Sequence, residues 1–289
     1  MSGPTQIEFA GSGGHRLAAD LWDGGGHPVL FLHGGGQTRH AWDKTAMRVR
    51  AAGLRAITVD QRGHGDSEWV RSGDYSFAHY AEDAAQLARA IAERYHTAPS
   101  AVGASLGGMA ALGAELFHGP LFDSLVMVDI TPRMNEGGVA KVHGFMRANM
   151  KEGFGSLDEA ADAIARYLPH RKRPTSLEGL RKNLRLGEDG RYRWHWDPAF
   201  VDETRGIRLN RDRYVREVMA GLPGLHLPVL LVRGMKSEIV QEEYAREFVD
   251  MAPNARMVDV GGAGHMVAGD RNDMFADAVL DFLAGEEAA

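Results

Sequence analysis

Residues 102–112 read VGASLGGMAAL and place one serine, Ser105, among small residues. The short apolar run 99–105 predicts a buried strand, and the residues from 106 onward predict a helix. Gly103 and Gly107 then flank Ser105 at a sharp reversal of the chain, where larger side chains would clash with neighbouring backbone. This spacing predicts a nucleophile elbow, with the Ser105 hydroxyl exposed at the carboxyl edge of a sheet.

Short apolar runs of the same kind recur on both sides of this elbow. They lie at 28–34, 54–60 and 124–130 and, after a long interruption, at 228–234 and 255–265. The stretch 77–95 has apolar residues at helical spacing. Strands that alternate with helices predict a mostly parallel α/β sheet with helices on both faces. The start of the chain, around Gly11 to Gly14, instead predicts an antiparallel pair of strands.

The interruption at 133–222 has a different pattern, which predicts a mainly helical insertion. Ser156 with Glu159 and Thr175 with Glu178 form capping-box patterns that begin two helices. The basic run at 170–174 is expected to be a solvated helix end or loop. Residues 133–216 carry a net positive charge, whereas the whole chain carries −6. We therefore expect a core formed by 1–132 and 223–289, with 133–222 as a cap.

The composition restricts the chemistry to a few side-chain types. The chain has 289 residues, 44% of them hydrophobic, which is enough for a sizeable core. It has no cysteine, which excludes disulfides, a thiol nucleophile and cysteine-ligated metals. The basic excess is too small to favour a nucleic-acid partner, and neither a membrane span nor a secretory signal is expected. These features predict a cytoplasmic protein whose chemistry depends on serine, histidine and carboxylate side chains.

Four motifs follow the predicted strands in order. They are HGGG at 33–36, DQRGHGDS at 60–67, GASLGG at 103–108 and GAGH at 262–265. Each stands at the carboxyl end of a strand, the edge where ligands bind in open α/β sheets. This combination resembles the α/β-hydrolase family. The resemblance implies an eight-stranded, mostly parallel sheet, and the insertion matches the position where that family carries its cap.

The resemblance also implies a serine, histidine and acid that act together. Ser105 matches the nucleophile, and His265, in the last glycine-rich loop, matches the general base. The acid is open, because Ser237 stands where the commonest family pattern has an aspartate. Asp129, at the end of the strand 124–130, matches an alternative position in the family and is favoured, with Glu238 as the other candidate.

Two backbone amides are implied as the oxyanion hole, one from Leu106 after the nucleophile and one from Gly35 in the HGGG loop. His33 and His64, within the two earlier motifs, are expected to hold those loops.

Aromatic residues near the end of the insertion allow two interpretations. Trp194 and Trp196, together with Tyr192, either line an apolar substrate pocket or form the small core of the insertion itself.

The function that these features predict is a serine hydrolase that cleaves a small-molecule carboxylic ester or lactone through an acyl-enzyme, without a metal or organic cofactor. A serine at the elbow argues against haloalkane dehalogenase and the usual epoxide hydrolase chemistry, which use a carboxylate there. A cofactor-free perhydrolase or haloperoxidase shares the same residues and stays an alternative. So does a non-enzymatic receptor for a small ligand, since a fold alone does not decide function.

Overall fold

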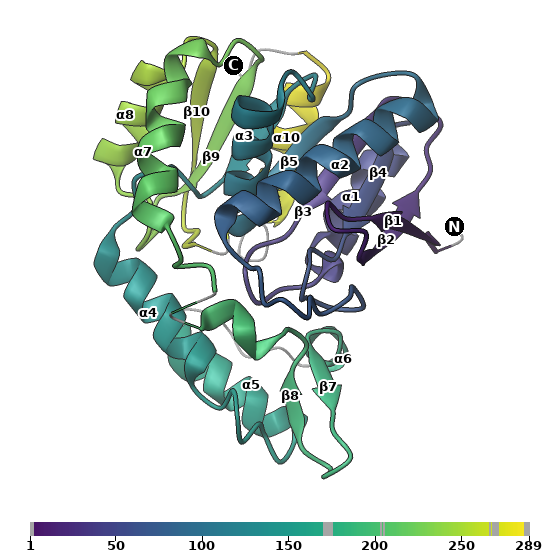
Figure 1. Cartoon of the computed structure of the whole chain (residues 1–289), viewed down its shortest axis with the longest axis vertical. Helices are drawn as coiled ribbons and strands as arrows, with labels where there is room; N and C mark the ends of the chain where they lie inside the picture. The colour runs from purple at the N-terminus through teal and green to yellow at the C-terminus, as the bar shows by residue number, and fades with distance from the viewer. Residues whose placement is uncertain are drawn as a thin grey trace.

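The computed structural model describes residues 3–169, 176–202, 204, 206–265, 267 and 272–285. Its centre is an eight-stranded sheet in the order β1-β2-β4-β3-β5-β6-β9-β10 (Figure 1). The six strands from β4 to β10 in this order are parallel, whereas β1 pairs antiparallel with β2 and β2 with β4. The bounds are Thr5–Ala10 (β1), Arg16–Trp22 (β2), Pro28–Leu32 (β3), Arg55–Val59 (β4), Ser100–Ala104 (β5), Leu125–Val128 (β6), Val229–Gly234 (β9) and Ala255–Val260 (β10).

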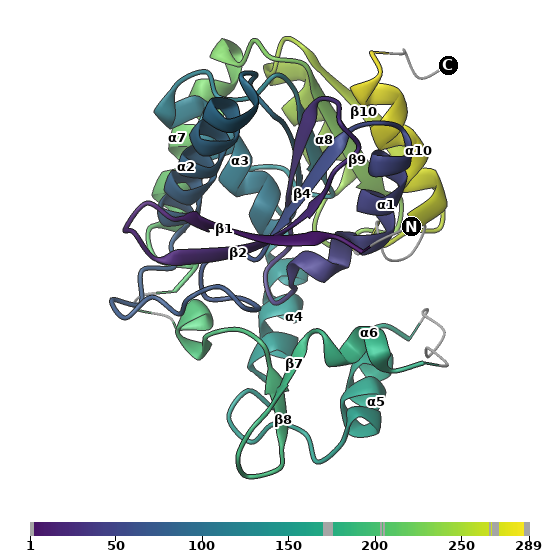
Figure 2. The ribbon, with the colours of Figure 1, turned by 90° about the vertical axis from the view of Figure 1, so that its right-hand side faces the viewer.

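Helices cover both faces of this sheet (Figure 2). One face is covered by α1 and α10, which pack against each other, and the opposite face by α2, α3 and α8. The bounds are Arg39–Trp42 (η1), Asp43–Ala51 (α1), Phe77–Tyr95 (α2), Leu106–His118 (α3), Glu242–Met251 (α8) and Asn272–Leu283 (α10). The prediction of a mostly parallel, eight-stranded α/β sheet with helices on both faces is confirmed, as is the antiparallel pair at the start.

Between β6 and β9 the chain leaves the sheet and forms a further set of elements, most of which lie in the lower part of Figure 1, whereas the last helix lies beside α3. They are Glu136–Arg147 (α4), Leu157–Tyr167 (α5), Glu178–Arg181 (α6), Leu184–Leu186 (β7), Tyr192–Trp194 (β8), Pro198–Val201 (η2), Arg211–Gly221 (α7) and Leu222–Gly224 (η3). The strands β7 and β8 form an antiparallel hairpin. A small apolar cluster, built on Phe154, Ala160, Ala163 and Leu184, holds this part together.

The predicted helix start at Ser156 is confirmed in part. The Ser156 hydroxyl accepts the backbone N–H of Glu159 at 3.1 Å, which begins α5. The Glu159 carboxylate accepts the N–H of Gly155 at 2.6 Å, one residue before the position that a capping box uses. Thr175 and the basic run at 170–174 lie outside the described residues.

The last helix of the segment, α7, lies against the core. Tyr214 of α7 stacks on Phe77 of α2, with ring centroids 5.5 Å apart, and its hydroxyl donates to the carbonyl of Met109 in α3 at 3.1 Å. Gly113 provides the space, because a Cβ there would lie 1.7 Å from the tyrosine hydroxyl. The elements that stand away from the sheet are therefore those that precede α7.

Candidate active site

Ser105 lies at the turn between β5 and α3, in a backbone conformation that few residues other than glycine adopt. Its φ is 47° and its ψ is −110°. The two flanking glycines are required by close approach of the backbone. A Cβ on Gly103 would lie 2.5 Å from the carbonyl carbon of Gly107, and a Cβ on Gly107 would lie 2.2 Å from the carbonyl oxygen of Leu32. The glycines around Ser105 therefore allow a turn that pushes its side chain out of the sheet.

Asp129 and His265, from different strand ends, are brought together beside this turn. The Nδ1 atom of His265 lies 2.8 Å from Oδ2 of Asp129, and the Asp129 side chain is fully buried. The other carboxylate oxygen, Oδ1, accepts the N–H of Gly234 at 2.9 Å. With its Nδ1–H donated to Asp129, His265 keeps Nε2 as a proton acceptor.

Ser237, which occupies the position of the usual aspartate, also binds Asp129. Its hydroxyl donates to Oδ2 of Asp129 and accepts the N–H groups of Ile239 and Val240 at 3.2 and 3.0 Å. The loop after β9 thus contributes a hydrogen-bond donor to the carboxylate that β6 supplies. Sequence reasoning noted the missing aspartate but did not find this role for the serine.

Glu238, the alternative acid, points to a different partner. Its carboxylate binds the Nζ atom of Lys141 on α4, and about half of its side chain is exposed (49%). Among the described residues, His265 has a hydrogen bond to Asp129 and none to Glu238. The structure therefore joins His265 to Asp129 and leaves Glu238 at the rim.

Backbone amides of the HGGG loop differ in whether they have a partner. The N–H of Gly34 donates to Oε1 of Gln37 at 3.0 Å, and that of Gly36 donates to Nε2 of His64 at 3.1 Å. Within the described part of the chain, the N–H of Gly35 has no acceptor, and neither does that of Leu106 at the start of α3. These two amides are the ones that the sequence predicted for an oxyanion.

His33 and His64 hold the loops around the site, as expected. Each donates Nδ1–H to a nearby carbonyl, that of Gly34 at 2.8 Å and that of Arg62 at 2.9 Å. Each also accepts an amide at Nε2, His33 from Gln61 at 3.0 Å. Burial lowers the pKa of His33 to about 4 and that of His64 to about 3. Both imidazoles are therefore neutral at neutral pH, as their acceptor role requires.

A buried ion-pair network fixes the chain that follows the HGGG loop. Asp60, at the end of β4, accepts the backbone N–H of Arg39 at 2.6 Å and binds its guanidinium as well. The same guanidinium contacts Asp20 at 3.0 Å and Asp66 at 2.8 Å. The sequence did not predict this ion-pair network for the DQRGHGDS motif, because Arg39 lies 21 residues away from Asp60 and belongs to no motif.

A cavity of about 430 Å³ joins the elbow to the elements beyond the sheet. Ser105, His265 and Gly35 line it from the core, while Trp194 and Trp196 line it from the other side. Most of the remaining wall is apolar and includes Val142, Phe145, Met146, Ile164, Phe200 and Ile207. The cavity is therefore suited to a largely apolar small molecule.

The two tryptophans fit both interpretations that the sequence left open, because they pack in a core and also line the cavity. Trp196 is 3% exposed and packs into the main core, edge-on to Phe200 at 6.3 Å between ring centroids. Trp194 is half-buried and packs on Phe154 of the small cluster at 5.3 Å. Both also line the cavity, whereas Tyr192 packs only against the small cluster within the described residues.

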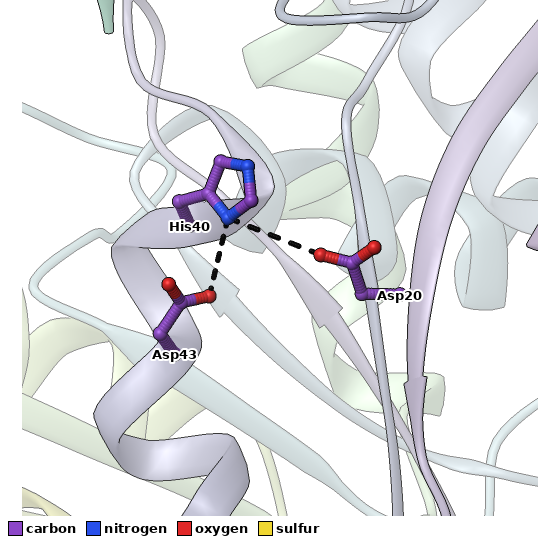
Figure 3. A group of neighbouring side chains, drawn as sticks. All are labelled: Asp20, His40 and Asp43. Atoms are coloured by element: carbon purple, nitrogen blue, oxygen red, sulfur yellow. Dashed lines mark hydrogen bonds and ion pairs between the residues drawn. The ribbon is translucent and has the colours of Figure 1, made fainter. Parts of the chain in front are cut away.

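One group of side chains has the spacing of a metal site in the part of the chain that the structure describes. It consists of Asp20, His40 and Asp43, next to η1 (Figure 3). Both carboxylates already have cationic partners, since Arg39 Nε lies 3.0 Å from Asp20 and Lys182 Nζ lies 2.7 Å from Asp43. We interpret the group as an ion-pair network that joins η1 to the residue after α6.

Comparisons with known proteins agree with this architecture. Residues 29–278 match the model of the alpha/beta hydrolase family. The chain is 31% identical to Esterase Rv0045c of Mycobacterium tuberculosis over 98% of this chain and 91% of that protein. It is 28% identical to 2-(acetamidomethylene)succinate hydrolase of Mesorhizobium japonicum, over 93% of this chain and 92% of that protein. A crystal structure of E-2-(acetamidomethylene)succinate hydrolase has the same fold, with a TM-score of 0.82 at 23% identity over 97% of this chain and 99% of that one.

No helix among the described residues is long and apolar enough to cross a membrane. The cytoplasmic location and the absence of a nucleic-acid partner stay predictions from the sequence.

Proposed function

The chain belongs to the alpha/beta hydrolase family, and we propose that it is a serine hydrolase that cleaves a small carboxylic ester or lactone through an acyl-enzyme. The prediction of an ester-cleaving hydrolase is confirmed at that level, since relatives over 98% and 93% of the chain are an esterase and a hydrolase. The acyl-enzyme and the roles of individual residues are proposals that rest on the geometry of the site.

One observation carries the proposal. His265 lines the same cavity as Ser105, and its Nδ1 atom is held by the fully buried carboxylate of Asp129. In the proposed reaction, Nε2 of His265 takes the proton of Ser105 as its Oγ attacks the substrate carbonyl. The protonated imidazole then gives this proton to the leaving alkoxide, which forms the acyl-enzyme. Attack by water, with His265 again as the base, releases the acid and restores the serine.

Asp129 is the proposed orienting acid in this reaction. Its bond to Nδ1–H keeps the His265 tautomer that leaves Nε2 free, and its charge stabilises the imidazolium that forms during attack. The hydrogen bonds from Gly234 and Ser237 hold the carboxylate in its buried position. Glu238 has no such setting, because Lys141 neutralises it at the rim.

The oxyanion of the tetrahedral intermediate is proposed to bind the N–H groups of Gly35 and Leu106. The support is that both donors lack an acceptor within the described residues, while the N–H groups of Gly34 and Gly36 are taken. Leu106 also begins α3, so the positive end of the helix dipole adds to the stabilisation.

We further propose that residues 133–222 act as a cap whose residues select the substrate, with Trp194 and Trp196 in contact with its apolar part. The support is that the cavity wall opposite Ser105 comes from this segment. A cap excludes water from the site, which strengthens the contacts to the oxyanion.

Labelling with a fluorophosphonate, followed by peptide mass spectrometry, tests the nucleophile. The adduct is expected on Ser105, and Ser105→Ala should lose both the label and the turnover of p-nitrophenyl esters. Ser156→Ala, at an exposed helix cap, is the matched control and should keep both. An adduct on another serine, or turnover that survives Ser105→Ala, would contradict the proposal. Adding hydrogen peroxide and acetate to the assay distinguishes the perhydrolase alternative.

A further inference from the structure

The charged groups that line the cavity are mostly basic. Among the described residues that line the cavity, Glu238 is the one acidic residue, and Lys141 already neutralises it. Arg208, Arg211 and Lys236 bring positive charge to the same wall. Arg208 and Lys236 are exposed and keep their hydration, whereas only 12% of the Arg211 side chain is exposed.

Arg208 and Arg211 stand together at the start of α7. The Nη1 atom of Arg211 lies 3.0 and 3.2 Å from the carboxylate oxygens of Glu136, whose side chain is 73% exposed. Arg211 itself is only 12% exposed, so it extends from this surface contact toward the cavity. Among the described residues, Arg208 has no carboxylate partner. Within the part of the chain that the structure describes, the pair therefore has one carboxylate, that of Glu136, for two guanidinium groups.

His143 on α4 shows that these positive charges act on the inside of the cavity. It lines the cavity, and its pKa is lowered to about 4, first by burial. The charges of Arg208, Arg147 and Arg211 lower it further, while that of Glu136 opposes them. At neutral pH His143 is therefore an uncharged hydrogen-bonding group beside the arginines, and the net field at this wall favours an anion.

The backbone adds to the same field. α7 has 11 residues and begins at Arg211, and its N-cap Asn210 makes no side-chain hydrogen bond to the first turn. The positive end of the helix thus lies next to the two guanidinium groups, with the carboxylate of Asp212 in the same first turn.

We propose that Arg208 and Arg211 bind a carboxylate of the substrate, so that the preferred substrates are esters with an apolar body and one carboxylate apart from the ester group. Guanidinium groups suit this task because they bind both oxygens of a carboxylate. His143 supplies a further hydrogen bond to the same group. The inference rests on the proposed ester hydrolysis at Ser105 and adds the class of ester.

Binding to Ser105→Ala protein tests the arginines without turnover. Calorimetry with monomethyl adipate, which carries one carboxylate, and with neutral dimethyl adipate should show tighter binding of the monoanion. Adding Arg208→Met or Arg211→Met should weaken the monoanion by about tenfold to a hundredfold and leave the diester within about twofold, since hydrogen bonds to charged groups have this strength. Arg213→Met is the matched control, because Arg213 is 74% exposed on the same helix and pairs with Glu217.

Equal binding of the two esters, or equal weakening of both by Arg208→Met, would overturn the proposal, because the arginines would then be structural. Partial recovery of monoanion binding in Arg208→Lys would support it.

Hydrolysis of the same two esters by the unsubstituted protein separates this proposal from the proposed function. Tight binding of the monoanion without hydrolysis of either ester would support the anion site and contradict the proposed ester hydrolysis. Hydrolysis of the diester without preference for the monoanion would keep the hydrolase and contradict the anion site.

Discussion

The carboxyl edge of the sheet and the segment at 133–222 line one cavity, but they hold their side chains in different ways. At the sheet edge, Asp129 is fixed by hydrogen bonds from the end of β9 and from the loop after it, and Ser105 by a turn that only its flanking glycines allow. In the segment, Trp194 packs on a small cluster of its own, and Arg208 is an exposed side chain on a turn.

We propose that this difference separates the chemistry, at the sheet edge, from the selection of the substrate, in the segment. A proton transfer needs atoms held to within a few tenths of an ångström, which buried backbone and charge networks provide. Recognition of an apolar body and a carboxylate tolerates more freedom. We therefore expect substitutions at the sheet edge to lower the rate for every substrate, and those in the segment to change the choice of substrate.

Removal of the orienting acid should produce the largest effect. Asp129→Asn is expected to lower kcat by about 10⁴-fold, because the imidazole then adopts the wrong tautomer. Glu238→Gln, at the rim, should change kcat by no more than about threefold. Steady-state kinetics with one p-nitrophenyl ester measure both variants. Near-full activity in Asp129→Asn, with loss in Glu238→Gln, would show that the orienting acid is Glu238, in the loop after β9, and not Asp129.

Acid should destabilise the sheet edge through its buried histidines. The pKa values of His33 and His64 are lowered from 6.5 to about 4 and about 3, so below pH 6.5 the unfolded chain binds protons that the folded chain does not. The free energy of unfolding should therefore fall as pH drops from 6.5 to 4, by about 3 kcal/mol for each histidine at the lower limit.

Urea unfolding between pH 7.5 and 4.5 measures this dependence. His64→Gln, which keeps an acceptor for the N–H of Gly36, should flatten the curve, and His226→Gln, at an exposed position, should not. A curve that is unchanged in His64→Gln would show that these loops do not control acid stability.

Hydrogen exchange should reveal a smaller difference, in local stability. Amides of α5 and β8 are expected to exchange through local openings that cost a few kcal/mol less than the near-global unfolding required by β3 and β6. Binding of a phosphonate at Ser105 should slow exchange in the segment only. Equal protection in both regions, with no response to the phosphonate, would mean that the segment is part of one rigid core.

The sequence predicted the sheet edge better than the segment at 133–222. Strands β3, β5 and β6 were predictable because buried parallel strands form short, continuous apolar runs with a motif at the end of each. Ser105 was a candidate from the local elbow pattern, whereas Asp129 and His265 were candidates because their places after strands match the family that the sequence resembles.

The contacts that sequence reasoning missed join distant segments. Ser237 binds Asp129 across 108 residues, and Arg39 reaches Asp60 from a different loop. The basic wall depends on how α4 and the start of α7 face each other, so Arg208 had no local signal. Packing of α7 on the core through Tyr214 was hidden in the same way, because Gly113 makes the space for it in another helix.

The central claim is that the side chains at the sheet edge act as one unit, and a double substitution tests it most directly. His265→Gln, Asp129→Asn and the double variant are compared by single-turnover hydrolysis of p-nitrophenyl acetate. If Asp129 acts only through His265, the double variant should be no slower than His265→Gln alone, within about threefold, because effects of residues that act as a unit do not add. A further loss of about 10⁴-fold in the double variant would show that Asp129 acts independently of His265 and would contradict this account.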